Sequence, residues 1–435
     1  MHSTGIILKK LSSIDVDEFI IGLLFILAPH TKYFLSDTSY SMRPVDIFFI
    51  IVLLLLLVLK KRIYWPVGLG VPFAIFYGAQ WFSVFWGVYE LNLYHVFVLT
   101  DGYVSYSYWE VAVRKIVLVT ICCAMVGYIW RYGRKVDFRV WLRYWFFGLL
   151  FAVLLHTLSY VFSGNFLVYR GGVFLEGNHA GAYYLPSFFL MWAANTRECR
   201  FAKFGMGLAV FGLLLSQSTS GLIILIIILW PIFYFRIRRA KSCRRILHVA
   251  FVLGSVLLPI ALLLLDNPIR EKLFGEELNE STYSRIERLL LIEVGLRMFS
   301  ESPIFGVGLQ VYGFLFSGFM SDFSALLKDE GRRIVNNIYI EVLAEQGVVG
   351  LFVFLWLNFR IFLFVLKKSS DTIILLAAFI SVLLSWFAFP SFTVSFHWII
   401  FAILMISDVS KRNSIEFEKA SGSNVNPIIV VEVLS

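Results

Sequence analysis

The chain reads Ser281-Thr282-Tyr283-Ser284-Arg285-Ile286-Glu287-Arg288, then Ser302-Pro303-Ile304-Phe305-Gly306-Val307-Gly308, then Asn336-Asn337-Ile338-Tyr339-Ile340-Glu341-Val342-Leu343-Ala344-Glu345-Gln346-Gly347-Val348-Val349-Gly350. These runs bring arginines, acids, glycines and aromatic residues together in a sequence that otherwise avoids charge. Most of the other segments are long apolar runs. We therefore interpret residues 281–350 as the functional part of the chain, and the remainder as the framework that holds it.

The composition excludes an ordinary soluble protein. Of the 435 residues, 59% are hydrophobic and only 15% are charged, whereas soluble domains average about 45–50% apolar and about 25% charged residues. Only helices or a closed barrel can cross lipid, because no water is present there to satisfy the backbone. The apolar runs are unbroken rather than alternating, so the sequence predicts an all-α polytopic membrane protein.

About twelve apolar runs are candidate transmembrane helices, several of them shorter than the ~20 residues that a perpendicular helix needs. They lie near 16–34, 46–59, 66–88, 109–129, 140–162, 179–195, 201–215, 220–235, 247–265, 337–366, 372–389 and 392–407. The predicted organisation is nine spans in 1–265 with an arginine-bearing outer loop at 163–178, a large outer loop bearing short helices at 266–336, three spans in 337–409, and a flexible tail at 410–435.

Basic residues set the predicted orientation. With the N-terminus in the cytoplasm, most of the 38 Lys and Arg residues fall in cytoplasmic segments, and the short outer loops are nearly free of them. This alternation follows the positive-inside rule and places both termini in the cytoplasm. The net charge of +9 is explained by loops that face the anionic inner leaflet, so it does not indicate a nucleic-acid partner.

The large outer loop is too long to be structureless. A helix is expected from Tyr283 to Phe299, with Ser284 and Glu287 as a capping box and an apolar stripe that includes Leu289 and Leu296. This stripe is compatible with a helix lying on the membrane surface or with one packed on top of the bundle.

Outer-face arginines are the first candidate site residues, because a guanidinium group binds phosphate through two hydrogen bonds and stays protonated. Together they suit a diphosphate held at the membrane surface, although each could also be an ordinary solvated charge. Arg114 and Lys115 lie just inside a span, where a charge either lines a cavity or extends to the interface. The candidates are Arg114, Arg170, Arg285, Arg288, Arg332 and Arg333.

A second set of candidates lies at the outer ends of two spans. Asn336 and Asn337 open one span, where Asn337, Glu341 and Glu345 recur at four-residue steps and form one polar face. The alternatives are helix capping and a face that orients or deprotonates an acceptor hydroxyl. Asn178 and His179 open another span, where His179 could cap the helix, bind sugar or act as a base.

No cofactor or metal site is expected. The four cysteines, Cys122, Cys123, Cys199 and Cys243, show no CxxC or Cys/His ligand spacing. Gly306, Gly308 and Gly313 miss the dinucleotide-binding spacing, and the chain contains no GxxxxGK[ST], GxSxG or HExxH.

The order of these motifs resembles the O-antigen ligase and Wzy-type O-antigen polymerase superfamily. The resemblance covers about Arg170 to Gly350. It rests on the three runs quoted first, on the polar turn Ser216-Gln217-Ser218-Thr219-Ser220-Gly221 and on Arg170-Gly171-Gly172 followed by Asn178-His179-Ala180-Gly181. It implies glycosyl transfer at the periplasmic face of the bacterial inner membrane, from a glycan on undecaprenyl pyrophosphate, with arginines in place of a metal to stabilise the leaving diphosphate.

One departure from the ligase pattern favours the polymerase branch. Ligases of this superfamily carry a histidine where this chain has Asn336, followed by Asn337, nine residues, Gly347 and Gly350. Because asparagine cannot serve as a general base, the resemblance implies a polymerase with Arg170, Arg285, Arg288, Asn336 and Glu341 as catalytic residues. The group that activates the acceptor is left open among Glu341, Glu176 and His179.

The remaining expectations follow from this resemblance. Substrate-binding residues would be Arg114, Glu176, Asn178, His179, Asn337, Arg332 and Arg333. The partners would be the undecaprenyl-pyrophosphate-linked oligosaccharide, membrane lipids and, as an open point, a chain-length regulator in the membrane. The alternatives are an O-antigen ligase that transfers glycan to lipid A–core and, from another class, a lipid or polysaccharide transporter or flippase. Against the transporter, charges gather in outer loops and no repeated halves are visible.

Overall fold

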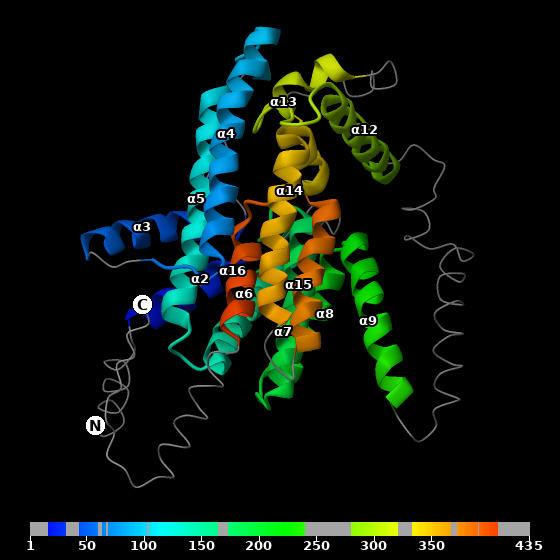
Figure 1. Cartoon of the computed structure of the whole chain (residues 1–435). Coiled ribbons are helices and arrows are strands. Elements are labelled where there is room, and N and C mark those ends of the chain that lie inside the picture. The colour runs from blue at the N-terminus through cyan, green and yellow to red at the C-terminus, as the bar shows by residue number, and fades with distance from the viewer. Residues whose placement is uncertain are drawn as a thin grey trace.

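The computed structural model describes residues 16–31, 43–59, 63–66, 68–101, 104–163, 173–239, 280–320, 333–366, 372–389 and 391–407. This part of the chain is helical apart from one antiparallel hairpin (Figure 1). Its elements are α2 (Val16–Leu27), α3 (Pro44–Val58), α4 (Gly70–Tyr94), β1 (Val98–Asp101), β2 (Val104–Ser107), α5 (Tyr108–Gly133), α6 (Phe138–Ser163), α7 (Gly177–Thr196), α8 (Ala202–Leu215), α9 (Thr219–Arg239), α12 (Glu280–Glu301), α13 (Tyr312–Leu315), η1 (Phe316–Phe319), α14 (Ile338–Leu366), α15 (Thr372–Ser385), η3 (Trp386–Ala388) and α16 (Ser395–Ile406).

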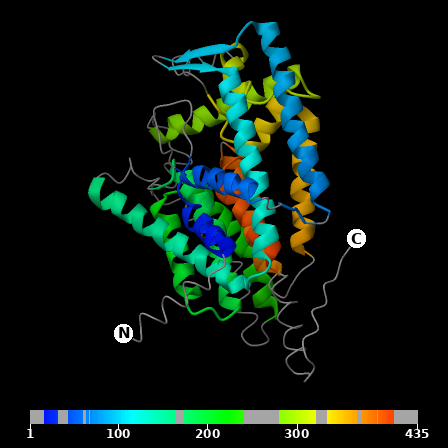
Figure 2. The same cartoon turned by 90° about the vertical axis from the view of Figure 1, so that its left-hand side faces the viewer.

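The molecule has a helical bundle below and a cap above, as drawn in Figure 1. The cap consists of α12, α13, η1, the hairpin of β1 and β2, the adjoining ends of α4 and α5, and the start of α14. The long helices α4 and α5 stand side by side and extend beyond the bundle at the upper end (Figures 1 and 2). The hairpin of β1 and β2 joins them there, with Val98 opposite Ser107. Helices α12 and α13 lie at this same end (Figure 2), so the segment that the sequence singles out is part of the cap.

Four described helices are long and apolar enough to cross a membrane, which fits an integral membrane protein. They are Gly70–Tyr94, Tyr108–Gly133, Phe138–Phe162 and Ile338–Leu366. The expected total of about twelve spans is not confirmed. The predicted span at 247–265 lies outside the described residues. Helix α3, predicted as a span at 46–59, lies across the direction of α4 and α5 rather than along it (Figures 1 and 2).

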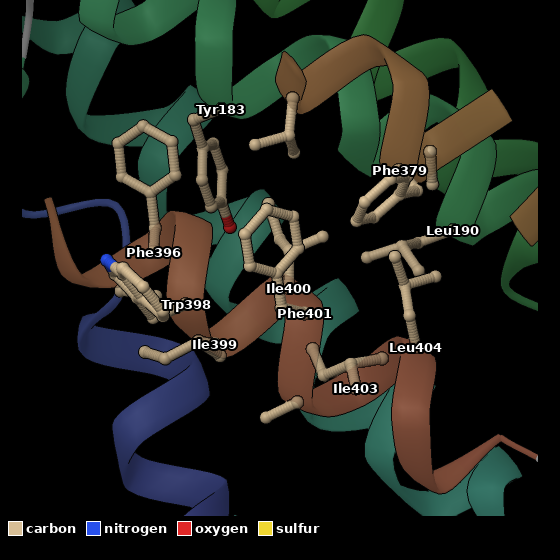
Figure 3. Close-up of a cluster of buried hydrophobic side chains, with 14 of the residues drawn as sticks. Tyr183, Leu190, Phe379, Phe396, Trp398, Ile399, Ile400, Phe401, Ile403 and Leu404 are labelled. Atoms are coloured by element: carbon tan, nitrogen blue, oxygen red, sulfur yellow. The ribbon is translucent and has the colours of Figure 1, made fainter. Parts of the chain in front are cut away.

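Helix α16 occupies the centre of the bundle, and every one of its residues is buried. Figure 3 shows its side chains, among them Phe396, Ile400 and Leu404, surrounded by Tyr183 and Leu190 of α7 and Phe379 of α15. An apolar helix that is buried all round has no polar face to present to solvent. This packing explains why a twelve-residue helix, too short to span lipid alone, is stable here.

Helix α14 departs from the single helix expected over this range, because it is broken at Gly347, where φ is 63° and ψ is −164°. Tyr339 and Phe354 lie on opposite sides of the break, and their ring centroids are 6.4 Å apart. In a straight helix, residues fifteen positions apart would be separated by about 22 Å along the axis. The short arm, residues 338–346, is therefore folded back toward the long arm, residues 348–366.

This break also changes the length of the candidate span. The long arm has 19 residues, which corresponds to about 28 Å at 1.5 Å per residue. That length is close to the ~30 Å hydrocarbon thickness of a bilayer. The long arm can therefore span the membrane alone, while the short arm belongs to the cap and is free to carry site residues.

A loop from the cap satisfies the backbone groups that the break exposes. The amides of Val307 and Gly308 donate to the carbonyls of Ala344 and Glu345, at 2.9 and 2.8 Å. In the opposite direction, the amides of Val348 and Val349 donate to the carbonyls of Pro303 and Ile304, at 2.9 and 3.2 Å. A broken helix leaves unpaired carbonyls before the break and unpaired amides after it, and residues 303–308 pair both sets. We refer to residues 303–308 together with the break at Gly347 as the backbone junction.

Helix α4 supports the backbone junction from the other side. The hydroxyl of Ser83 donates to the Glu345 carbonyl at 3.2 Å, and the indole of Trp86 donates to the Gly306 carbonyl at 2.8 Å. The side-chain amides of Gln80 and Gln346 exchange two hydrogen bonds, of 3.0 and 3.1 Å. These contacts fix the short arm to the rigid α4 at the end away from Asn337.

Candidate active site

The candidate site begins with α12, which packs on the short arm of α14. Its buried face consists of Leu291, Val294 and Met298, and a Cβ on Gly295 would meet Ile340 at 2.6 Å. Of the two alternatives for this helix, the structure supports packing on top of the bundle.

One expectation about α12 is wrong. Ser284 and Glu287 do not form a capping box at its start, because the helix begins at Glu280 and the Glu287 carboxylate is bound to Arg333. Leu289 and Leu296 of the predicted apolar stripe are 63% and 44% exposed, so this stripe is not the face that packs on the short arm.

Arg288 and Arg333 are brought to the same region of the cap. The Arg333 guanidinium pairs with the Glu287 carboxylate at 2.6 Å, and both side chains are mostly buried. Gly295 meets Ile340 further along the same two segments, so α12 and residues 333–340 run in parallel. Arg288, which is partly buried, therefore lies level with the start of the segment that leads to Asn336.

Three predicted arginines are not placed at this site by side-chain contacts. Arg170 and Arg332 lie outside the described residues. The backbone of Arg285 lies in α12, one turn before Arg288, but its side chain is outside the described part. The expected convergence of Arg170, Arg285 and Arg288 stays a prediction.

Asn337 acts as the N-cap of the short arm. Its side-chain oxygen accepts hydrogen bonds from the amides of Tyr339 and Ile340, at 3.0 and 3.2 Å. Helix capping, one of the two alternatives from the sequence, is thus observed for Asn337. Asn336 immediately precedes it and is partly exposed, which leaves its side chain the more accessible of the two.

Glu341 is held by a buried ion pair. The Lys115 ammonium lies 2.9 Å from its carboxylate, and the two side chains are 6% and 2% exposed. Lys115 also donates to the Ser391 hydroxyl at 3.1 Å and lies 4.5 Å from the centroid of the Phe392 ring. The carboxylate is therefore fixed against α5 and the segment before α16, one turn from Asn337.

Glu345, the third residue of this polar face, is buried within the cap. Burial raises the pKa of the nearby Tyr312 phenol, and the negative charge of Glu345 raises it further. The Tyr312 hydroxyl donates to the Leu291 carbonyl at 2.6 Å. Tyr312 thus stays protonated at neutral pH and ties α13 to α12 beside the short arm.

The first turn of α7 contributes a buried histidine. The His179 ring packs on Phe389 with centroids 4.4 Å apart, and neither ring nitrogen has a hydrogen-bond partner within the described part of the chain. Asn178 beside it is partly buried, whereas Glu176 precedes the helix and is exposed. Of the three candidate bases, only Glu176 is open to solvent.

Two motif segments from the sequence meet near His179. A Cβ on Gly181 would be 2.5 Å from the Ser218 hydroxyl, so the start of α7 packs directly on the turn between α8 and α9. The Ser218 hydroxyl accepts from the Gly221 amide at 3.2 Å and caps α9. Residues 178–181 and 216–221, separated in sequence, therefore pack against each other.

The sequence drew attention to Arg114 and Lys115 together, but only Arg114 was taken as a candidate site residue. Arg114 is partly buried, whereas Lys115 is the one paired with Glu341. Arg43 and Asp46 were missed, although they form a second buried ion pair at 2.7 Å. The available signal was an ionisable residue inside an apolar run, which is costly and usually functional.

The fold and the candidate site define a class of protein. A membrane-embedded bundle carries a cap in which the short arm of α14, with Arg333, Asn336 and Asn337 directly before it, packs on α12, which carries Arg288. Guanidinium groups favour phosphate or carboxylate ligands, and the polar arm can bind hydroxyl groups. This combination suits an integral membrane protein that handles an anionic, hydroxylated ligand.

Comparison with protein families identifies the particular group. Residues 204–355 match the Wzy_C family, described as O-antigen ligase. The chain thus carries an O-antigen ligase family domain over about a third of its length, which supports the O-antigen ligase/Wzy superfamily recognised from the motifs. No curated protein matches the chain. The matched range includes α12, the backbone junction and the short arm of α14.

Proposed function

We propose that the chain is an O-antigen or related surface-polysaccharide polymerase. It transfers a glycan from undecaprenyl pyrophosphate to the terminal sugar of another lipid-linked repeat unit. The family match supports ligase and polymerase activity alike. Asn336 supports the polymerase branch, because it stands where the superfamily's ligases have a histidine.

The observation that carries the proposal is the place of the short arm within the cap. The arm bears Glu341, follows directly after Arg333, Asn336 and Asn337, and lies beside α12, which carries Arg288. In the proposed reaction, an acceptor hydroxyl oxygen forms a bond to the anomeric carbon of the donor while the bond from that carbon to the diphosphate oxygen breaks. Arg170, Arg285 and Arg288 stabilise the departing diphosphate, and Arg332 and Arg333 help to bind it, without a metal.

The acceptor side of the proposed site comes from α14, α7 and α5. Asn336 and Asn337 orient the acceptor sugar, and the hydroxyl proton passes to Glu341, Glu176 or His179. Glu176, Asn178 and Arg114 complete the substrate contacts. A chain-length regulator in the membrane is a further proposed partner.

The distribution of basic residues between the two ends of the molecule supports a periplasmic site. One group of described basic residues lies on or beside the turns between α5 and α6 and between α7 and α8, namely Arg131, Arg134, Lys135, Arg139, Arg197 and Arg200. These turns lie at the end of the molecule opposite the cap (Figure 1). By the positive-inside rule, the turns are cytoplasmic and the cap is periplasmic, with the chain in the bacterial inner membrane.

Lipopolysaccharide from a strain that lacks the gene tests the proposal. On a silver-stained gel, loss of a polymerase leaves core carrying a single repeat unit. The ligase alternative, after which the matched family is described, predicts bare core. A transporter or flippase also predicts bare core, but with repeat units retained at the cytoplasmic face. An unchanged ladder would overturn the proposed function.

A further inference from the structure

A buried chain of hydrogen bonds connects the short arm of α14 to the interior of the bundle. It runs from Glu341 to Lys115 at 2.9 Å, from Lys115 to Ser391 at 3.1 Å, and from Ser391 to Thr393 at 2.9 Å. The Thr393 carbonyl then accepts from the Arg43 guanidinium at 2.8 Å. This chain links α14, α5, the segment before α16 and α3.

The far end of the chain is also an ion pair. Arg43 donates to Asp46 at 2.7 Å, and the Ser395 hydroxyl donates to the other carboxylate oxygen of Asp46. Arg43 is 5% exposed and Asp46 is fully buried. The two ion pairs are thus joined through residues 391–395, and a network in which such groups are satisfied holds its members rigidly.

Lys115 holds the end of the short arm that the backbone junction does not reach. The junction binds the arm at Ala344 and Glu345, through Val307 and Gly308. Lys115 binds it at Glu341, one turn from Asn337. Without the ammonium group, the end of the arm next to Asn336 and Asn337 would lose its ionic contact with α5. The other end would stay bound to the backbone junction.

Stability alone does not explain why the contact between Lys115 and Glu341 is an ion pair. Burying two charges costs free energy that their attraction only partly offsets, and apolar residues of similar size are often as stable or more so. An apolar pair could therefore hold the arm against α5. The charge of this pair has a use if Glu341 must act as an oriented carboxylate.

We propose that Lys115 is a positioning residue of the transferase, acting through Glu341. It keeps the Glu341 carboxylate ionised and aimed at the acceptor sugar, and it sets the angle of the short arm. This inference rests on the proposed function and deepens it, because it gives Lys115 of α5 a defined role on the acceptor side of the site.

The test uses the full chain, expressed at matched levels in a strain that lacks the gene, with polymer measured per amount of protein. Lys115→Met keeps the length of the side chain and removes its charge, and Lys115→Arg keeps the charge. We expect Lys115→Met and Glu341→Gln each to lose roughly tenfold or more of the polymer, and the double variant to be no worse than Glu341→Gln alone, as for residues that act as a unit. Lys115→Arg should retain most of the activity.

Stability is measured on the same variants by thermal unfolding after extraction. Lys115→Met leaves a buried carboxylate uncompensated, so it should unfold earlier than the double variant Lys115→Met with Glu341→Gln. A merely structural role predicts that polymer returns when stability returns in the double variant, and that result would overturn the inference. Full activity of Lys115→Met would overturn it too, as would a double variant weaker than both single variants.

A replacement variant, the unaltered chain and a control variant complete the experiment. If Lys115→Met does not accumulate, Lys115→Gln replaces it, since Gln can still donate to Glu341 and Ser391 without the charge, and full activity of that variant would overturn the inference. Failure of the unaltered chain to restore polymer would instead refute the proposed function. Arg297→Met is the matched control, because Arg297 forms an exposed pair with Glu293 and should leave polymer unchanged.

Discussion

Gly347 lies directly against the carbonyl oxygen of Ile304, so closely that a Cβ at this position would collide with it. Its φ of 63° and ψ of −164° belong to a region that only glycine adopts readily. The contact and the dihedral angles together make this glycine the pivot between the two arms of α14. The position of every candidate residue from Asn336 to Glu341 depends on it.

Gly347→Ala should therefore destabilise the cap by about 3 kcal/mol, from backbone strain and the collision with Ile304. Thermal unfolding of the extracted protein measures the loss, and polymer should fall with it. Gly78→Ala in α4 is the control, because a Cβ there meets nothing within 4 Å and alanine favours a helix. Equal thermal midpoints for the two variants would contradict the role assigned to the break.

The paired amides of Gln80 and Gln346 should behave as a unit. Gln80→Leu leaves the buried Gln346 amide without its partner and should cost about 1–3 kcal/mol. Replacing both by Leu removes the unsatisfied group, so the double variant should be nearer to the original protein than either single variant. Additive losses across this double-mutant cycle would show that the two amides do not support each other in solution.

The buried pair of Arg43 and Asp46 gives a third prediction. Asp46→Asn should destabilise the protein by about 3–5 kcal/mol, because it leaves the Arg43 guanidinium uncompensated in the bundle. Glu293→Gln, which breaks the exposed pair with Arg297, should cost at most about 1 kcal/mol. Thermal unfolding of both variants side by side is the measurement, and a harmless Asp46→Asn would argue against the buried pair.

Arg288→Ala tests the proposed diphosphate site. We expect long polysaccharide chains to be lost while the protein still inserts in the membrane, because a guanidinium that stabilises the leaving group contributes mainly to the transition state. Arg297→Ala on the same helix is the control, since Arg297 is exposed and paired with Glu293. A normal ladder from Arg288→Ala at normal protein level would remove this arginine from the mechanism.

The sequence by itself determined the class of the protein, a helical membrane protein, and singled out residues 281–350 as its candidate functional segment. Unbroken apolar runs dictate helices in lipid because backbone groups there must be paired internally. Local spacing also gave helix capping as one of two alternatives for Asn337, and the structure shows this cap.

Only the tertiary structure decided how these parts meet. No local pattern shows that α14 reverses at Gly347, because the apolar run continues through the break and reads as one helix. Lys115 and Glu341 are 226 positions apart, and Gln80 and Gln346 are 266 positions apart. Such pairs follow from how helices pack rather than from what each helix contains, so one-dimensional periodicity gives no information about them. For the same reason, the apolar stripe through Leu289 and Leu296 did not show which face of α12 packs on the short arm, where Leu291, Val294 and Met298 are buried.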